Sequence, residues 1–367
     1  MKALFFLSHP AHFHLFKNII ENLKNKRHSV IIVVKAKDIL ENLLKEKGWD
    51  YFNVQPNPKM NQKNIILKSI FGLLKRNVGL AKVIVRDRPA IMMGTEWSIA
   101  NCGWLFQIPN IIVNEDDTDA VPENKFFYPF AKHLLLPDCC DPDLWNDKKI
   151  TYSSYHELAY LHPKYFKPDK SILGELKVYN KPYYIIRLVS LSASHDINRK
   201  GISFEVLEKI IALLSKVGRV FITSEKKLPQ EFEKYRMTIP PSKMHHVLYY
   251  ADMYIGDSQT MATEAAVLGV PSLRFNDFIG KLGCLEELEH KYVLTHGIKT
   301  SEPEKLYQKV EELLNKPNLK QEWQKRRQKM LSEKIDVTAF IVWFIENYPE
   351  SVRIMKENPV ETQRQFL

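Results

Sequence analysis

Small polar residues stand directly before an alanine-rich stretch in the second half of the chain, in GDSQTMATEAAVLGVP at 256–271. Residues of this kind cap helices, so the pattern predicts a helix that begins near Met261, just after a buried strand at 253–255. The free N–H groups and the dipole at such a helix start bind anions, and a diphosphate is the obvious ligand. The residues expected to hold it are Ser258, Gln259 and Thr260. The same pattern also fits an ordinary β-α-β corner in which Ser258 is only a helix cap.

Two further features complete the expected nucleotide site. Glu264 lies one turn into the predicted helix, where its carboxylate can accept hydrogen bonds from the hydroxyl groups of a ribose; a plain surface acid is the alternative. A second polar run, RLVSLSASHDINRKG at 187–201, includes the end of the strand expected at 183–188. We expect this run to hold the pyrophosphate from its other side and to offset its charge, through Arg187, Ser192, Ser194 and His195.

Three histidines, in SHPAHFH at 8–14, follow the first predicted strand, which spans 2–7. Turns after parallel strands are where α/β sheets bind ligands, and histidine titrates near neutral pH, which suits a general base. We therefore expect His12 to be a catalytic base, and His9 and His14 to contact an acceptor. In the alternative interpretation these histidines cap the helix predicted from about Leu15, or face solvent.

Carboxylates follow two other predicted strands of the first half. Glu115 and Asp117 come directly after the strand at 111–113, and Glu96 follows the strand at 90–93. A carboxylate at a strand end can activate or hold an acceptor hydroxyl, so Glu115 and Asp117 are candidate catalytic residues and Glu96 is a candidate acceptor ligand. A solvated acidic loop is the alternative interpretation of the run at 114–119.

The elements that position these residues alternate between strand-like and helix-like patterns, which indicates an α/β fold with doubly wound parallel sheets. With 367 residues the chain has room for two cores. We predict two such domains, the first at 1–165 and the second at 166–340. Helices are expected at about 126–132 and at 244–250, and a strand is expected at 272–275. From 137 to about 182 the periodicity is lost, and this segment is interpreted as an irregular connection with the inter-domain linker.

The net charge of +10 favours anionic partners, although no nucleic-acid motif accompanies it. The helix predicted at 63–88 combines an apolar set with mostly positive charges; we interpret it either as an ordinary domain helix or as a contact with an anionic membrane. No apolar run is long enough to span a bilayer, and the first residues do not fit a signal peptide. The four cysteines lack paired spacing, so reduced thiols in the cytoplasm are expected.

The run at 256–271 resembles the nucleotide-sugar segment of GT-B glycosyltransferases and of hydrolysing UDP-GlcNAc 2-epimerases, where small polar residues hold the diphosphate and a downstream glutamate holds the ribose. Together with SHPAHFH at 8–14, YHELAYLHP at 155–163 and SASHD at 192–196, it resembles an uncharacterised GT-B-like family that carries a domain-of-unknown-function label. The resemblance implies two Rossmann-like domains that face each other across a cleft: an acceptor domain at 1–165 and a nucleotide-sugar domain at 166–340. It also implies a C-terminal helical tail at 341–367 that packs back on the first domain. It also implies a site without metal.

The resemblance extends to single positions. His12 falls where the lipid-II-forming GlcNAc transferase, another GT-B enzyme, has its histidine, although that family's glycines are missing here. Glu115 corresponds to the glutamate of the His-Glu-Gln-Asn segment of the same transferase. His195 takes the place of the histidine in the HRREN turn of the epimerases.

These features predict a metal-independent glycosyltransferase without a cofactor. It would move a sugar from a UDP- or other NDP-sugar to a glycan or lipid-linked acceptor in surface-polysaccharide biosynthesis, in the cytoplasm or at the inner face of the plasma membrane. A hydrolysing UDP-sugar 2-epimerase is the alternative enzyme, and would need carboxylates on both sides of the sugar. A non-catalytic sugar-nucleotide-binding or scaffold protein is the alternative outside catalysis.

Overall fold

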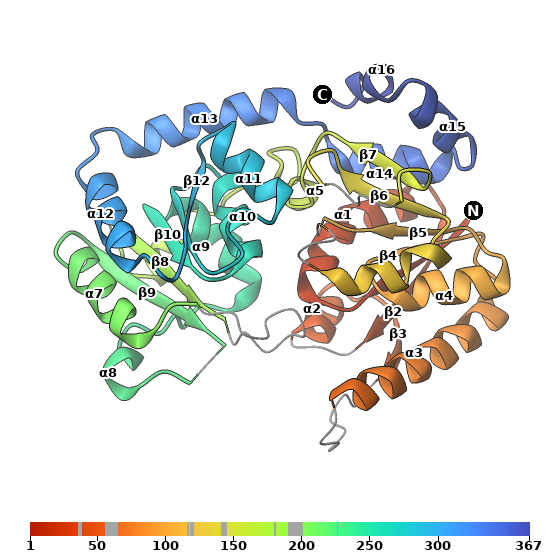
Figure 1. Ribbon diagram of the computed structural model, residues 1–367, viewed down its shortest axis with the longest axis horizontal. Coiled ribbons are helices and arrows are strands. Elements are labelled where there is room, and N and C mark those ends of the chain that lie inside the picture. Colours follow the sequence, from red (N-terminus) through yellow and green to blue (C-terminus); the bar gives the residue numbers. More distant parts are fainter. Residues whose placement is uncertain are drawn as a thin grey trace. The chain divides into compact units, whose positions relative to one another are not determined.

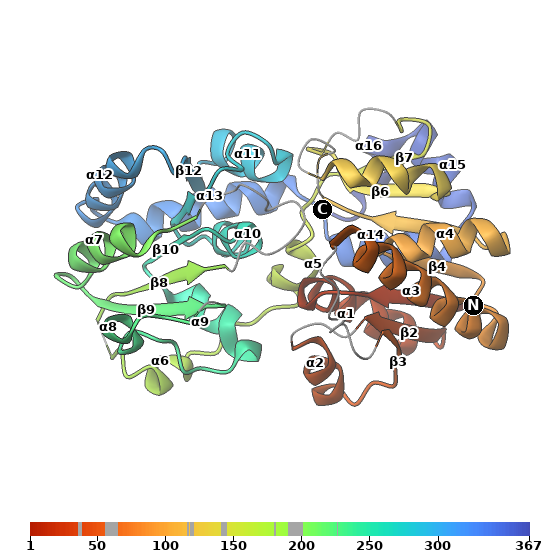
Figure 2. The same cartoon turned by 60° about the horizontal axis from the view of Figure 1, so that its bottom comes forward.

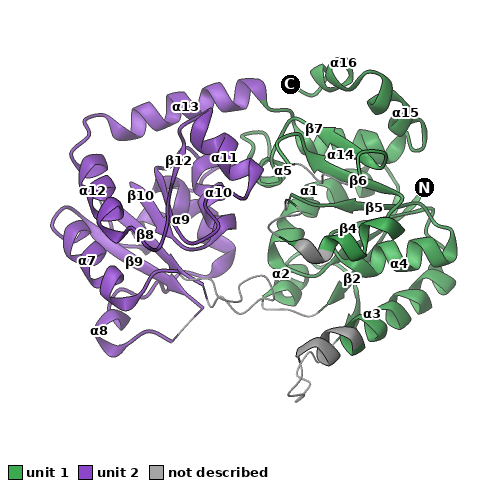
Figure 3. Cartoon of the chain, in the orientation of Figure 1, with its two compact units in different colours: residues 1–165, 334–367 green, residues 166–333 purple. Residues whose placement is uncertain are grey.

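Two compact units divide the chain in the computed structural model (Figure 3): Met1–Tyr165 with Lys334–Leu367 form unit 1, and Phe166–Glu333 form unit 2. The structure describes residues 1–35, 39–55, 65–115, 117, 121–140, 145–179, 181–189, 201–225 and 227–367, with the backbone alone for 65–70 and 122–123. Each unit is an α/β structure around one parallel sheet. The predicted fold, two parallel α/β domains, is confirmed.

Unit 1 contains a seven-stranded sheet in the order β3-β2-β1-β4-β5-β6-β7, in which every neighbouring pair is parallel (Figure 1). The chain builds outward from β1 to β3, then returns to the other side of β1 with β4, so the topological switch point lies between β1 and β4. The strands are β1 (Lys2–Leu7), β2 (Ser29–Lys35), β3 (Phe52–Gln55), β4 (Ile91–Gly94), β5 (Asn110–Val113), β6 (His133–Pro137) and β7 (Lys149–Tyr152).

Helices cover both faces of this sheet, which is why most of its strands are apolar on both sides. On one face Leu4 and Phe6 share a core with α3, α4 and the 3-10 helix η2. On the other face Phe5 packs against Phe16 of α1, with ring centroids 5.3 Å apart. The helices of unit 1 before the chain leaves it are α1 (Pro10–Asn25), α2 (Leu40–Glu46), α3 (Ile65–Asp87), α4 (Trp97–Phe106), η1 (Pro122–Phe126), η2 (Tyr128–Phe130) and α5 (Leu158–Leu161).

The C-terminal segment returns to unit 1 and adds α14 (Val337–Glu346), α15 (Glu350–Glu357) and α16 (Pro359–Arg364). The carbonyl of Ala159 accepts hydrogen bonds from Thr338 Oγ1 at 2.9 Å and from Asn18 Nδ2 at 2.7 Å, which joins α14, α5 and α1. Residues 334–340, assigned to the second domain from the sequence, also lie in unit 1, where Ile335 N donates to Ser153 O at 3.0 Å. Among the described residues no helix has the length and apolarity needed to cross a membrane.

Unit 2 has a five-stranded parallel sheet in the order β12-β11-β10-β8-β9, with β8 and β9 side by side (Figure 2). Its switch point lies between β8 and β10. The strands are β8 (Tyr183–Leu188), β9 (Arg219–Ser224), β10 (Met253–Gly256), β11 (Ser272–Phe275) and β12 (Thr295–Ile298). The helices are α6 (Ile172–Glu175), α7 (Phe204–Leu214), α8 (Gln230–Glu233), η4 (Pro241–Lys243), α9 (Met244–Tyr250), α10 (Gln259–Val267), α11 (Gly283–His290), α12 (Pro303–Leu314) and α13 (Leu319–Glu333).

Three local predictions from the sequence are wrong. The helix expected from about Leu15 begins at Pro10, because His9 caps it through Ala11 N and proline suits the first helical position. The helix expected at 126–132 is replaced by η1 and η2, each of which has proline in its first turn. The segment after 137 contains β7, a four-residue edge strand in which only alternate residues are fully buried, a pattern too short to stand out.

Candidate functional site

The carboxyl edge of the unit 2 sheet is built around Asp257, the first residue after β10. Its side chain is buried; Oδ1 accepts a hydrogen bond from Val189 N at 2.8 Å and Oδ2 accepts one from Ile202 N at 3.3 Å. One carboxylate therefore joins the two ends of the segment 190–200 at the switch point. Gly201 lies against this carboxylate so closely that any Cβ there would overlap it. Ser192, Ser194 and His195 are within this segment and lie outside the described residues.

Ser258 is the N-cap of α10, with an extended backbone and a side chain that accepts from Met261 N at 3.4 Å. Gln259 and Thr260 form the first turn, where backbone N–H groups have no partner within the helix. The hydroxyl of Tyr254 donates a hydrogen bond to Ser258 O at 3.2 Å, which fixes the backbone at the start of α10. Burial raises the pKa of the Tyr254 hydroxyl well above its usual value, so it stays protonated and able to donate. The helix therefore begins with the side-chain cap that the sequence predicts at Ser258.

Glu264 is buried in α10 rather than being a surface acid. Its Oε1 lies 2.9 Å from His245 Nε2 of α9, and the two residues are 6% and 8% exposed. Since a carboxylate only accepts hydrogen bonds, His245 Nε2 carries the proton and donates it. The ring of Phe166 packs edge-on against His245 at 6.4 Å between centroids. Glu264 is thus held in one orientation by a histidine that the sequence analysis did not single out.

Arg187 ends β8 next to this corner, opposite Gly256 of β10. Its Nη1 donates to Thr223 Oγ1 at 2.8 Å, and its Nη2 forms an ion pair with Glu225. Both partners belong to the end of β9 or directly follow it. The guanidinium therefore spans from β8 toward β9, where Glu225 balances its charge at the carboxyl edge of the sheet.

In unit 1, His12 connects the loops that follow β1 and β4 at the switch point. Ser8 N donates to His12 Nδ1 at 3.2 Å, and Thr95 Oγ1 lies 2.7 Å from the same nitrogen. His9 caps α1, with its ring 5.9 Å from that of His12, so both remain at the carboxyl edge of the sheet. His14, two residues after His12 in α1, packs against Tyr160 of α5 at 5.2 Å between ring centroids.

Glu115 follows β5 and meets a second histidine that the sequence analysis did not assign. Its Oε2 lies 3.4 Å from His156 Nδ1, and its backbone carbonyl accepts from Cys140 Sγ at 3.0 Å. His156 is buried just before α5, in the stretch YHELAYLHP. Asp117 lies in the same loop after β5, where its backbone carbonyl accepts from Val121 N at 3.1 Å.

Glu96 is engaged inside unit 1. Its Oε1 forms an ion pair with Arg76 Nε at 2.8 Å, and both side chains are buried. Arg76 also donates from Nη1 to Gln55 Oε1 at 2.9 Å, so the pair connects α3 with the ends of β3 and β4. These contacts favour a structural role for Glu96.

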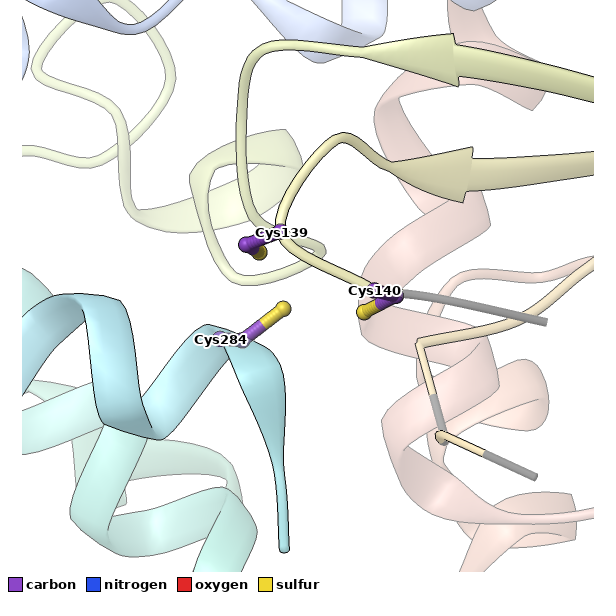
Figure 4. Close-up of side chains that lie close together, drawn as sticks. All are labelled: Cys139, Cys140 and Cys284. Atoms are coloured by element: carbon purple, nitrogen blue, oxygen red, sulfur yellow. The ribbon is translucent and has the colours of Figure 1, made fainter. Parts of the chain in front are cut away.

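The cysteines are all free thiols in the structure. Cys139 and Cys140 are neighbours in the connection that follows β6 in unit 1, and Cys284 lies in the first turn of α11 in unit 2 (Figure 4). Burial raises the pKa of the Cys102 thiol to about 12, so Cys102 is not a thiolate near neutral pH.

The sequence around these residues gives little indication of the contacts that the sequence analysis missed. Thr95 stands beside the candidate Glu96, His156 lies in a stretch already noted for its resemblance, and His245 lies in a helix whose bounds were predicted correctly. Each pairing joins residues distant in the chain: 83 positions separate His12 from Thr95, and 19 separate His245 from Glu264. Strand order, not sequence spacing, brings them together.

Comparison with known proteins identifies relatives of the whole chain. The profile of a family described as "Protein of unknown function (DUF354)" matches residues 3–350. The uncharacterized protein MJ0665 of Methanocaldococcus jannaschii is 20% identical over 277 residues, which cover 73% of this chain and 79% of that protein.

Solved structures share the fold at low sequence identity. The structure of S. aureus MnaA with UDP is 14% identical, with a TM-score of 0.66 and coverage of 95% of this chain and 97% of that chain. Spinosyn rhamnosyltransferase SpnG with spinosyn aglycone is also 14% identical, with a TM-score of 0.61 and coverage of 95% and 100%. Glycosyltransferases and UDP-N-acetylglucosamine 2-epimerases are both among the proteins of this fold. The fold is therefore GT-B-like.

Proposed function

The chain belongs to the DUF354 family and has a GT-B-like fold, and from this premise we propose that it is a glycosyltransferase with a nucleotide-sugar donor. The observation that carries the proposal is the corner of unit 2 around α10. At this corner the capped N-terminus of α10 can bind an anion. The buried carboxylate of Glu264, held by His245, lies further along the same helix. A diphosphate beside a ribose presents the same two chemistries, an anion and a pair of hydroxyl donors.

In this proposal α10 binds the diphosphate at Ser258, Gln259 and Thr260, while Glu264 accepts hydrogen bonds from the ribose. Arg187 and the segment that carries Ser192, Ser194 and His195 offset the phosphate charge. The N–H groups and dipole of α10 stabilise the diphosphate as it leaves with the bonding electrons of the anomeric C–O bond. Because this stabilisation comes from the protein, the proposed reaction needs neither a metal ion nor a cofactor.

The acceptor is proposed to bind at the carboxyl edge of the unit 1 sheet, with His9 and His14 nearby. His12 takes the proton of the acceptor hydroxyl, whose oxygen then forms the new bond to the anomeric carbon. Contacts with Ser8 and Thr95 hold the imidazole of His12 in place for this step. Glu115 or Asp117 is the alternative base. The proposed acceptor is a glycan or lipid-linked sugar of surface-polysaccharide biosynthesis, met in the cytoplasm or at the inner face of the plasma membrane.

A UDP-sugar 2-epimerase is the second candidate function. Two observations favour keeping it: epimerases share the fold, and Glu115 with His156 provides a carboxylate and an imidazole in unit 1. Removal and return of a proton beside the anomeric centre requires such acid and base groups.

The test is incubation with a panel of nucleotide sugars, with and without an extract of lipid-linked and soluble glycans, while free nucleotide and sugar configuration are monitored. A transferase releases nucleotide in an acceptor-dependent manner and extends the acceptor. Isomerisation of the sugar in the absence of glycans would establish the epimerase instead. Tight nucleotide-sugar binding without any turnover in the presence of the acceptor would contradict both and leave a binding or scaffold protein.

A further inference from the structure

Helix α3 of unit 1 presents apolar side chains to solvent along one stripe. Phe71, Leu74, Val78 and Val85 are 50–62% exposed, and their spacing of three, four and seven residues places them on one side of the helix. The opposite side buries its own apolar residues in the core of unit 1. A surface helix of a globular protein normally carries polar residues on its outer face, so the exposed stripe needs an explanation.

Exposed apolar side chains also occur on the elements that pack beside α3. α4 contacts α3 where Cys102 Sγ donates to Asn77 O at 3.5 Å, and η2 contacts α4 where the rings of Trp104 and Phe130 meet edge to face at 5.5 Å. Trp104 and Leu105 are 57% and 66% exposed at the end of α4. We call the following set the α3–η2 surface: Phe71, Leu74, Val78, Val85, Trp104, Leu105, Phe126 and Phe130, all of them exposed.

Positive charges flank this surface. Lys75 and Lys82 are exposed and follow Phe71 and Val78 by one helical turn. Lys125 in η1 and Lys132, just after η2, are exposed as well. Within α3 and α4 the only exposed or partly exposed acid whose side chain the structure describes is Asp87, which pairs with Arg86 at 2.5 Å. Arg76, by contrast, is buried against Glu96 and does not belong to the surface.

We infer that the α3–η2 surface docks on an anionic lipid bilayer. Aromatic and branched side chains beside lysines fit the boundary between acyl chains and negatively charged headgroups. A second copy of this chain fits less well, because a two-fold interface through this surface would place its lysines against one another. The inference goes beyond the proposed function, since docking involves no nucleotide sugar and needs no turnover.

The experiment is sedimentation of the full chain with vesicles of phosphatidylcholine alone or mixed with phosphatidylglycerol, at low and high salt. We expect binding to the mixed vesicles at low salt, weaker binding at high salt, and little binding to phosphatidylcholine alone. The double variants Leu74→Glu/Val78→Glu and Lys75→Glu/Lys82→Glu should each weaken binding at least about tenfold. The matched control Val217→Glu/Val360→Glu changes exposed valines outside the surface and should bind like the parent protein.

Several outcomes would overturn the inference. One is a parent protein that remains in the supernatant with mixed vesicles at low salt; another is an equal loss of binding in the control variant. A third is a concentration-dependent dimer, measured by analytical ultracentrifugation, that Leu74→Glu/Val78→Glu abolishes, because the surface would then serve self-association. Circular dichroism checks that each variant is folded. We expect the variants to fold because the substituted positions are exposed. None of these results depends on the sugar-transfer activity, so docking and catalysis succeed or fail separately.

Discussion

Replacement of Glu264 by alanine separates two contributions of one carboxylate: its bond inside unit 2 and its proposed bond to a ribose. The Glu264–His245 hydrogen bond is buried and 2.9 Å long, so the variant removes a partner of His245 at a cost of about 1–3 kcal/mol in the free energy of unfolding. The ribose hydroxyls lose an acceptor as well. We expect this second loss to weaken UDP binding by about 1–3 kcal/mol, which is a rise of roughly 5- to 150-fold in Kd.

Both quantities can be measured on one preparation, the UDP affinity by calorimetry and the free energy of unfolding by urea titration. His245→Gln removes the imidazole and keeps the carboxylate, so we expect a loss of stability with a smaller loss of affinity. Glu311→Ala, at an exposed position of α12, is the control and should change neither quantity. If a folded Glu264→Ala protein binds UDP as tightly as the parent does, Glu264 lies outside the nucleotide site and the assignment of α10 is refuted.

Three further predictions concern unit 1 and the pH profile. His12→Ala should lower turnover at least about a hundredfold with UDP affinity unchanged, and a near-normal rate would move the base to Glu115 or Asp117. Arg76→Met leaves the Glu96 carboxylate buried without its cation, so urea titration should show that the free energy of unfolding falls by about 3–5 kcal/mol. Adding Glu96→Gln should restore part of this loss, and a loss below about 1 kcal/mol would contradict a buried pair. Burial lowers the pKa of His133 and His296 to about 4, so both are neutral in the folded protein near neutral pH. The free energy of unfolding should therefore be full above about pH 6.5 and fall toward pH 4, less steeply in His133→Gln; a free energy that does not change with pH would contradict this.

Local patterns were sufficient for much of unit 2. The helix at 244–250 and the strand at 272–275 have the bounds that the sequence predicts, and Gly269 ends α10 with a φ of 72° before Pro271. Ser258 caps α10, Gly269 ends it and Pro271 precedes the strand at 272–275, and the effect of such residues on the backbone is local. The same rules explain why the sequence alone identifies Ser258 as a helix cap.

What the patterns could not supply is the pairing of side chains from separate elements. Glu96 was a candidate acceptor ligand because it follows a strand, and nothing near it in the sequence shows that Arg76, 20 positions earlier, is buried beside it. The histidines His156 and His245 were likewise present in known motifs or helices, but their carboxylate partners come from other elements. Such pairs depend on the order of the strands in the sheet, which a single sequence constrains only weakly.

The two hydrogen bonds that Asp257 accepts have a consequence for the length of the chain that they enclose. Val189 and Ile202 are fixed to one carboxylate, so the chain between them starts and ends at defined points. In general, lengthening a loop between fixed ends costs only about 0.6 kcal/mol for each doubling. Changes in the length of the chain between these two residues therefore cost little in loop closure, as long as Gly201 stays beside the carboxylate, where any Cβ would overlap it. Asp257 thus sets the end points of this interval independently of its length.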